Sequence, residues 1–347
     1  MSAETKTMRA VQVERHGDPD VLRLVAMPKP EPGPGDVLVR LRASGVCGHD
    51  VLARAGRIPL PLPQVLGHEG AGEVVATGPE VVGLAVGDRV ALTPMLPCGR
   101  CEPCLAGNAR TCRVRGGLYG EEIPGTYGEY VVANELSAVR LPNAIDFIRG
   151  SILGCAVGSA VRAVRRGRVA LGETVVVTGA SGGVGIHLVQ VARAVGARVI
   201  AVTGSATNVS ALREAGAHEV LAGDQPFESE VRRLTGGSGA DVVLDNVGPP
   251  LFKSCLASLR TTGRLVAVGN VQPREVPANL GQLIMREFEL IGTARPGRLE
   301  LQESIRLVAN GSVKPWVGRT FQLDEAASAH RLMEERGVVG RLVLEVE

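Results

Sequence analysis

Short stretches of alternating apolar and polar residues dominate the first half of the chain. The stretches 8–13 and 36–41 alternate, and between them lies a turn region at 28–35 that is rich in proline and glycine. Residues 70–75 and 88–92 are further strand candidates. A period of two is typical of strands that bury one face. This half is therefore predicted to be rich in β-structure, with many turns.

The pattern changes from about residue 153 onward. The run 174–178 is short, apolar and β-branched, as buried parallel strands are. Strand and helix candidates then alternate, which predicts a parallel, doubly wound α/β sheet. After residue 310 the chain becomes strand-rich again, with one helix expected at 323–335. Strands are expected at 174–178, 198–203, 219–222, 241–245 and 264–269, and helices at 183–195 and 210–215.

Length and composition narrow the class of protein. At about 150 residues per domain, 347 residues suggest two domains. Apolar residues make up 45% and charged residues 21%, with a net charge of +2, so we expect a globular protein without the basic surface of a nucleic-acid binder. The first 19 residues contain no apolar leader, and the longest uncharged run, 174–192, contains glycines and polar residues. We therefore expect no membrane span and a cytoplasmic location.

A glycine-rich segment follows the strand candidate 174–178 and opens a helix candidate. Ala180 replaces the first glycine of the pattern G-x-G-x-x-G, which leaves A-x-G-x-x-G. Small residues let the backbone approach a pyrophosphate, which the N–H groups of the helix N-terminus bind. The strand–turn–helix context favours a dinucleotide site over a plain turn. The expected cofactor contacts are Gly179, Ala180, Ser181, Gly182, Gly183, Val184 and Gly185, with Asn246 and Gly269 after later strands.

The end of the next strand candidate bears on the choice between NAD and NADP. A carboxylate there would bind the 2′-hydroxyl of NAD. The chain has none at this place, where Thr203 is followed by Ser205, Thr207 and Asn208, which can donate to a 2′-phosphate. The nearest cation in sequence is Arg213. These residues favour NADPH over NADH.

Four of the seven cysteines lie close together in the first half. Cys98, Cys101, Cys104 and Cys112 form the pattern C-x2-C-x2-C-x7-C. Four thiolates at this spacing can complete a tetrahedral zinc site, and a complete site is structural rather than catalytic. An odd number of cysteines in a chain of this length argues against a disulfide framework. A DNA-binding zinc ribbon is disfavoured, because the paired knuckles and the basic surface are missing.

Other ligand-type side chains are dispersed. Cys47, the pair His68 and Glu69, and Cys155 lie in three separate segments. Their spacing alone does not show that they converge. Taken singly, each is more typical of a buried cysteine or a hydrogen-bonded histidine than of a metal ligand.

The run G-H-E-x-x-G-x5-G-x-x-V at 67–81 resembles the signature of zinc-containing medium-chain dehydrogenases/reductases, the alcohol dehydrogenase-like family. The four-cysteine segment is similar to the structural zinc site of that family. Cys47 and Cys155 stand where the family has its cysteine ligands of catalytic zinc. The resemblance extends over essentially the whole chain. It implies a GroES-like catalytic domain at 1–152, a Rossmann nucleotide-binding domain at 153–311, and a return of 312–347 to the catalytic domain.

The same resemblance implies a second, catalytic zinc ion, so that each chain would hold two. Its ligands would be Cys47, His68 and Cys155, the Cys2His set of alcohol dehydrogenase. Glu69 would be an exchangeable or nearby ligand, and Asp50 would orient His68.

One position departs from the family pattern. The family has serine or threonine two residues after the first ligand, where a proton relay begins, and this chain has His49. Imidazole can also transfer protons near neutral pH, although a surface histidine is the simpler interpretation. The departure puts an alcohol-type relay in doubt.

The nucleotide half resembles the quinone-reductase and enoyl-reductase branches in the segments 178–190 and 263–271, and is most similar to acryloyl-CoA reductases. The implied function is NADPH-dependent reduction of the C=C bond of a short or branched 2-enoyl-CoA, of the acryloyl- or 3-methylcrotonyl-CoA type. A zinc alcohol dehydrogenase or aldehyde reductase is the first alternative. A quinone reductase-like enzyme or a non-catalytic nucleotide-binding protein is the second.

The resemblance also implies partners. The family forms homodimers or homotetramers, and the apolar segment 282–291 is the expected interface. An acyl-CoA substrate would need cations to bind its phosphates. Clusters of arginines are, however, more often simply solvated side chains at the protein surface. The candidate arginines are Arg162, Arg165, Arg166 and Arg168, and Arg110, Arg113 and Arg115.

Overall fold

The computed structural model describes residues 6–106, 108–112, 114, 117–223 and 226–347, and only the backbone of Arg110. Contacts divide the chain into two compact units. The first consists of Met1–Gly158, Arg295–Ala309 and Val317–Glu347, and the second of Ser159–Ala294 and Asn310–Trp316.

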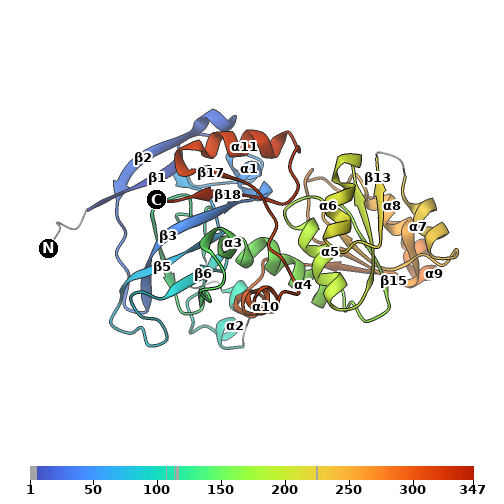
Figure 1. Cartoon of the computed structure of the whole chain (residues 1–347), viewed down its shortest axis with the longest axis horizontal. Coiled ribbons are helices and arrows are strands. Elements are labelled where there is room, and N and C mark those ends of the chain that lie inside the picture. Colours follow the sequence, from blue (N-terminus) through green and yellow to red (C-terminus); the bar gives the residue numbers. More distant parts are fainter. Residues whose placement is uncertain (1–5, 107, 113, 115–116, 224–225) are drawn as a thin grey trace. The chain divides into compact units, whose positions relative to one another are not determined.

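The first unit is built around the long strand β3 (Asp36–Val46; Figure 1). The residues of this strand are mostly buried. β3 pairs antiparallel with β5 along one side, and with β9 and then β18 along the other. The largest sheet has the order β10-β6-β5-β3-β18-β17 with β9 added at β3, and smaller sheets have the orders β2-β1-β4 and β7-β8. The other strands of this unit are β1 (Thr7–Val13), β2 (Leu22–Pro28), β4 (Gln64–Val65), β5 (Gly70–Thr77), β6 (Arg89–Leu92), β7 (Met95–Leu96), β8 (Gly117–Leu118), β9 (Tyr130–Asn134), β10 (Ala138–Arg140), β17 (Val317–Gln322) and β18 (Arg341–Glu345).

Helices of the first unit are few and mostly short. The core of this unit includes Leu41, Leu66, Leu92, Tyr127 and Leu344, which are fully buried and come from both ends of the chain. The helices and helical turns are η1 (Pro19–Val21), α1 (Gly48–Arg54), α2 (Glu102–Leu105), η2 (Ala109–Thr111), α3 (Phe147–Ser151), η3 (Leu153–Val157), α10 (Arg298–Ala309), η5 (Leu323–Glu325) and α11 (Ala326–Glu334).

The second unit is a parallel sheet with the strand order β13-β12-β11-β14-β15-β16. Its centre is β11 (Thr174–Val177), where Val175, Val176 and Val177 are fully buried, as in a sheet covered on both faces. The strand order reverses between β11 and β14, which is where open α/β sheets bind ligands. The other elements are α4 (Gly158–Arg166), α5 (Gly185–Ala194), β12 (Arg198–Thr203), η4 (Ala206–Asn208), α6 (Val209–Glu214), β13 (Glu219–Ala222), α7 (Glu228–Leu234), β14 (Ala240–Asp245), α8 (Phe252–Ser258), β15 (Leu259–Ala267), α9 (Leu280–Arg286) and β16 (Glu289–Gly292).

The structure confirms the predicted fold class: a β-rich unit and a doubly wound parallel sheet. The extents of the units differ from the expected ranges chiefly at α10, which belongs to the first unit although 153–311 is expected to be the nucleotide-binding domain. The reason is local, because the Arg298 guanidinium in α10 donates to the carbonyl oxygens of Glu135 and Ala138.

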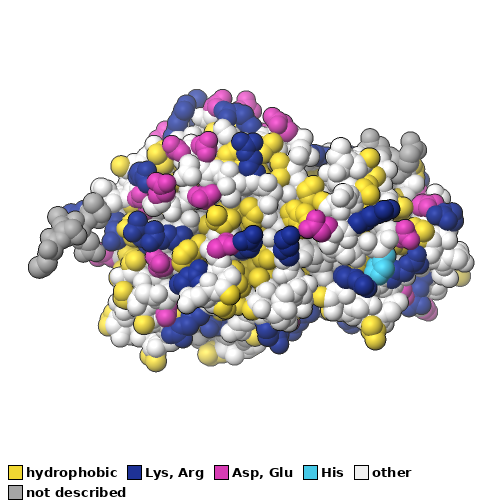
Figure 2. All heavy atoms as spheres, viewed as in Figure 1, with side chains coloured by type: hydrophobic (Ala, Val, Ile, Leu, Met, Phe, Trp, Pro, Cys, Tyr) yellow, Lys and Arg dark blue, Asp and Glu magenta, His cyan; other side chains and the backbone are white. Residues whose placement is uncertain are grey.

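The surface carries both signs of charge. Figure 2 shows lysine and arginine side chains interspersed with acidic ones over the face in view, in keeping with 38 basic and 36 acidic residues. Among the helices in the described part of the chain, none has the length and apolar character needed to cross a bilayer.

Candidate active site

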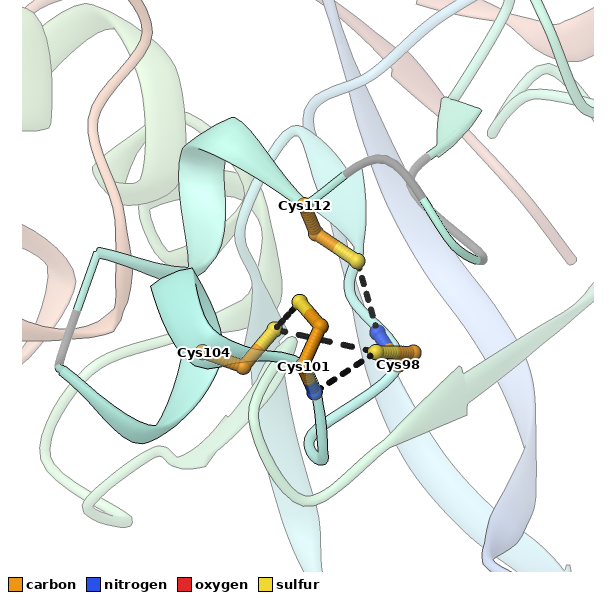
Figure 3. A group of neighbouring side chains, drawn as sticks. All are labelled: Cys98, Cys101, Cys104 and Cys112. Carbon is orange, nitrogen blue, oxygen red and sulfur yellow. Dashed lines mark hydrogen bonds between the residues drawn. The ribbon is translucent and has the colours of Figure 1, made fainter.

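Four cysteine side chains of the first unit point toward one another (Figure 3). The sulfur of Cys104 is 3.4 Å from that of Cys101 and 4.0 Å from that of Cys98. The backbone N–H of Cys98 donates to the sulfur of Cys112 at 3.2 Å. Four sulfurs bound at about 2.3 Å to one tetrahedral zinc ion lie roughly 3.8 Å apart. The observed spacing therefore fits one zinc ion whose coordination is complete.

The local backbone explains how so short a segment presents four sulfurs. Cys101 immediately precedes α2 and Cys104 lies within it, while the N–H of Cys101 donates to the sulfur of Cys98 at 3.4 Å. Gly99 has a φ of +77°, which glycine adopts without strain. Burial raises the pKa of Cys104 to about 12, so this thiol needs a neighbouring cation in order to ionise. The donor set is thus suited to a metal ion.

A second group of ligand-type side chains converges in the first unit from three separate segments. Cys47 immediately precedes α1, His68 and Glu69 lie between β4 and β5, and Cys155 is in η3. Their ligand atoms all lie within 4.8 Å of one another. The structure thus brings together the residues that sequence spacing could not connect, and two thiols, an imidazole and a carboxylate are donors that zinc accepts.

Two glycines permit this convergence, and each directly precedes a ligand-type residue. A Cβ at Gly154 would lie 1.8 Å from the carbonyl oxygen of Leu92, so only glycine lets η3 pack so closely against β6. Gly67 has a φ of +91°, and a Cβ there would lie 2.3 Å from the ring of Tyr127. Backbone geometry at 67 and 154 therefore determines where His68 and Cys155 stand.

The two thiols of this second group compete for ionisation. A hydrogen bond from Cys155 lowers the pKa of Cys47 well below its usual range, and the charge of Arg341 adds to this effect. The same hydrogen bond raises the pKa of Cys155 well above its usual range. A metal cation would remove the competition, because both sulfurs could then be thiolates.

Arg341, at the start of β18, forms an ion pair with Glu69 at 2.7 Å, and the two side chains are only 4% and 0% exposed. Burial raises the pKa of Glu69 to about 7, although Arg341 opposes this shift. Neither carboxylate oxygen of Glu69 accepts a hydrogen bond from the described residues. The carboxylate therefore keeps lone pairs available for a cation beside it.

Asp50 connects two of the ligand-type residues. One of its oxygens is 3.1 Å from Nδ1 of His68, and the other accepts the backbone N–H of Cys47 at 2.9 Å. Burial works against a charged His68, yet Asp50 raises the pKa of this histidine well above its usual range. With Nδ1 engaged by Asp50, Nε2 of His68 is the nitrogen left for a metal.

His49 lies beside this group. Its Nε2 is 2.7 Å from Oε1 of Glu121, and its ring is edge-on to that of His68, with 5.7 Å between the centroids. Arg295 lies 3.6 Å from the other oxygen of Glu121. The structure therefore places a carboxylate beside His49 and leaves the imidazole partly exposed.

The glycine-rich turn of the second unit follows β11 and leads into α5. Gly179 has a φ of +56°, and a Cβ at Gly185 would lie 2.0 Å from the carbonyl oxygen of Gly179. Thr178, before the turn, donates from its hydroxyl to Asp245 at 2.6 Å. This bond connects the turn to Asp245, the last residue of β14. The glycine-rich turn and Asn246, both expected to contact the cofactor, therefore lie together at the carboxyl ends of β11 and β14.

Hydroxyl and amide groups gather at the end of β12. The Thr203 hydroxyl lies 3.2 Å from that of Ser181 and accepts the side-chain N–H of Asn208 at 3.1 Å. Ser205 and Thr207 hydrogen-bond to each other at 2.8 Å. Thr207 also donates to Asn208 at 3.3 Å, so these hydrogen bonds connect Ser181, Thr203, Ser205, Thr207 and Asn208. At the ends of β14 and β15, a Cβ at Gly269 would lie 2.3 Å from the carbonyl oxygen of Asn246.

Of the arginines expected to contact CoA, Arg162, Arg165 and Arg166 lie on α4, and Arg168 follows it closely. Arg168 pairs with Glu289 at 2.5 Å, and Arg165 and Arg166 are exposed on α4. Outside the described part of the chain lie Arg113, Arg115 and the side chain of Arg110.

Sequence reasoning missed four residues that contact the second group or its neighbours: Arg341, Tyr127, His330 and Glu121. Each belongs to a segment that is remote in sequence from its partner. The one signal in the sequence is the pair Gly125 and Gly128 around Tyr127, because glycines at such positions suggest that another group packs closely against the backbone.

Comparison with known proteins agrees with this geometry. The model described as the alcohol dehydrogenase GroES-like domain matches residues 33–143, and that of zinc-binding dehydrogenases matches 183–310. An acryloyl-coenzyme A reductase of Metallosphaera sedula is 36% identical over 97% of this chain and 99% of its own. The crystal structure of AibC has a TM-score of 0.92 and 43% identity, covering 99% of this chain and 96% of its own. That of an NAD-dependent alcohol dehydrogenase has a TM-score of 0.93 and 38% identity, covering 98% and 100%.

Proposed function

The chain belongs to the zinc-binding dehydrogenases of the alcohol dehydrogenase-like, medium-chain family, and we propose that it reduces the C=C bond of a short or branched 2-enoyl-CoA with NADPH. Acryloyl-CoA and 3-methylcrotonyl-CoA represent the substrate class. The observation that carries the proposal is the His49–Glu121 pair beside His68, in a chain similar over nearly its whole length to an acryloyl-CoA reductase. An imidazole at this position replaces the hydroxyl with which an alcohol-type relay begins.

Reduction adds a hydride to the β-carbon of the enoyl thioester and a proton to its α-carbon, while NADPH becomes NADP⁺. When bound, NADPH supplies the hydride and zinc supplies a Lewis acid for the thioester oxygen. Cys47, His68 and Cys155 would hold that zinc, with Glu69 as the nearby carboxylate. The four cysteines of the separate site would hold a second, structural zinc ion.

The surrounding residues hold these groups in place and move the proton. Asp50 holds the His68 ring and the Cys47 backbone N–H, which fixes the side on which Nε2 is presented. His49, held by Glu121, passes a proton toward the α-carbon. Arg341 balances the charge of Glu69, so this carboxylate can stay ionised while buried.

The cofactor proposal rests on the second unit. The turn 179–185 would bind the pyrophosphate at the N-terminus of α5, since Gly185 allows the close backbone approach. The hydroxyl and amide groups of Ser205, Thr207 and Asn208 would bind the 2′-phosphate of NADPH, and the segment 203–208 itself carries no carboxylate that would repel it.

A zinc-dependent alcohol dehydrogenase or aldehyde reductase is the second candidate function. The observation that favours it is the 38% identity and TM-score of 0.93 to the NAD-dependent alcohol dehydrogenase structure. The same ligand set would serve either reaction, because both polarise a carbonyl oxygen.

We further propose that the chain forms a homodimer through the edge of the second unit. β16 is the last strand of its sheet, and α9 nearby exposes Leu280, Ile284 and Met285 by 70%, 73% and 80%. An unpaired strand edge beside a group of exposed apolar side chains is a typical association surface.

The substrate class is tested by NADPH oxidation with crotonyl-CoA and 3-methylcrotonyl-CoA beside a panel of aldehydes. We expect turnover of the enoyl thioesters, and we expect His49→Asn to slow it by roughly 10²-fold because a proton donor is lost. The zinc content of His49→Asn should equal that of the wild type. Turnover of aldehydes alone would sink the enoyl-CoA proposal and support the alcohol dehydrogenase candidate.

Metal analysis tests the two zinc sites separately. The wild type should contain about two zinc ions per chain, and Cys155→Ser and Cys104→Ser should each contain about one. Cys155→Ser should keep its melting temperature and lose turnover, whereas Cys104→Ser should melt at a lower temperature. A wild type with about one zinc ion, which Cys155→Ser retains, would instead indicate a non-catalytic nucleotide-binding protein or a quinone reductase-like enzyme.

Ser205→Asp tests the assignment of NADPH. The new carboxylate would repel a 2′-phosphate and bind a 2′-hydroxyl, so the ratio of kcat/KM for NADPH to that for NADH should fall at least tenfold, which is about 1.4 kcal/mol. Ser205→Ala is the matched control for loss of the hydroxyl alone and should change the ratio less. A wild type that prefers NADH would contradict the proposal directly.

The dimer is tested by light scattering on the wild type and on the variant Ile284→Glu/Met285→Glu. We expect a dimer that the two charges convert to a monomer, because each would be buried unpaired in the interface. Leu171→Glu, at an exposed leucine elsewhere in the second unit, should leave the dimer intact. A monomeric wild type rules the interface out.

A further inference from the structure

A chain of buried hydrogen bonds leads away from His68 into the C-terminal part of the first unit. His68 Nδ1 lies 3.1 Å from Asp50, whose other oxygen accepts the hydroxyl proton of Tyr127 at 3.0 Å. Nε2 of His330, in α11, lies 3.2 Å from the same hydroxyl oxygen. All four side chains are buried. The last two have no part in the proposed reaction, yet they are connected to its metal site.

The direction of each proton follows from the donors available. Asp50 accepts three hydrogen bonds, from His68, Tyr127 and the N–H of Cys47. Tyr127 has one hydroxyl proton and gives it to Asp50, so its oxygen must accept from His330, which therefore carries its proton on Nε2. His330 is neutral: burial lowers its pKa to about 4, and its Nδ1 has no partner among the described residues.

Packing holds the Tyr127 ring in one place. The space that a Cβ would need at Gly67 is filled by this ring, and Gly67 is the residue before His68. The rings of Tyr127 and His330 meet edge-on, with 5.9 Å between the centroids. Contacts between α1 and α11 bring the helix that carries Asp50 to the helix that carries His330.

We propose that Tyr127 and His330 are positioning residues of the metal site, which act by fixing the carboxylate of Asp50. A carboxylate turns easily about its last side-chain bond, where the torsional wells are broad. By donating to Oδ2 of Asp50, the Tyr127 hydroxyl prevents this rotation of the carboxylate. Oδ1 of Asp50 then stays directed at Nδ1 of His68, and Nε2 of His68 stays directed at the metal position.

This inference rests on the proposed zinc site of Cys47, His68 and Cys155, and its readout is the release of zinc to a chromogenic chelator. Wild-type protein should release its two zinc ions in two phases, and the phase missing from Cys155→Ser identifies this site. Tyr127→Phe keeps the ring against Gly67 and removes only the hydroxyl. We expect Tyr127→Phe to speed zinc release from the Cys47–His68–Cys155 site about tenfold, as the loss of a residue that orients a metal ligand does. The release phase of the four-cysteine site should not change.

Tyr119→Phe is the matched control. Tyr119 is equally buried in the same unit, and its hydroxyl donates to the carbonyl oxygen of Val132 at 2.8 Å, away from Asp50. This variant loses a comparable hydrogen bond, and we expect both of its release phases to match the wild type. The inference is overturned if Tyr127→Phe releases zinc at the wild-type rate, or if Tyr119→Phe accelerates the same phase equally.

A second pair of variants tests whether His330 acts through Tyr127. His330→Leu should speed release from the same site, whereas His330→Gln, whose amide N–H can still donate to the tyrosine oxygen, should remain close to wild type. In the Tyr127→Phe background His330→Leu should add nothing, because the hydroxyl that links them is gone. Additive effects of the two substitutions, or a glutamine variant as fast as the leucine variant, would contradict the role assigned to His330.

The result separates two kinds of failure. A wild type that shows only the four-cysteine phase disproves the zinc site, and with it the proposed function. A wild type with both phases, neither altered in Tyr127→Phe, leaves the zinc site standing and removes only the positioning role.

Discussion

The antiparallel pairing of β18 with the second half of β3 is the interaction on which the candidate active site depends. In this register Leu342 lies opposite Val46, and the pairing continues toward the middle of β3. The residue after β3 is Cys47, and the first residue of β18 is Arg341. The pairing therefore delivers a cation from the C-terminal end of the chain to a ligand group supplied by the N-terminal half. Without it, the buried carboxylate of Glu69 would lose the guanidinium group with which it pairs, and removing one partner of a buried ion pair is strongly destabilising.

The C-terminal segment contributes none of the ligand-type residues, yet it governs their surroundings. Arg341 lowers the pKa of Cys47 and opposes the rise in the pKa of Glu69. α11 adds His330 behind the Tyr127 hydroxyl. The first unit must therefore be discontinuous in sequence: the segments that neutralise and orient the ligand group can approach it only by pairing with β3 and packing on α1. α10 joins the same unit for a similar reason, since its Arg298 binds carbonyl groups beside β10.

Sequence reasoning succeeded where the determining contacts are local. Hydrophobic periodicity placed β1, β3, β5, β11 and β12 within a few residues, and the four-cysteine group needs only one short segment to close. It could not bring Cys47, His68 and Cys155 together by spacing, because β-pairing does that, and only the family resemblance connected them. Short helices such as α8 and α9 were missed because seven residues hold barely two turns of periodic signal. Ion pairs such as Arg341–Glu69 carry no sequence signal.

The glycine-rich turn 179–185 shows that the backbone conformation of a motif matters more than its exact residue pattern. The strict pattern fails at Ala180, but the turn needs its left-handed residue one position earlier, at Gly179, where φ is +56°. Ala180 itself is fully buried with an ordinary backbone, so a methyl group is tolerated there. Gly185 is indispensable for a different reason, because its missing Cβ makes room for the carbonyl oxygen of Gly179 at 2.0 Å. Gly179 thus provides the left-handed backbone, and Gly185 provides the space for the carbonyl oxygen. Ala180, the residue that departs from the pattern, stands where neither requirement applies.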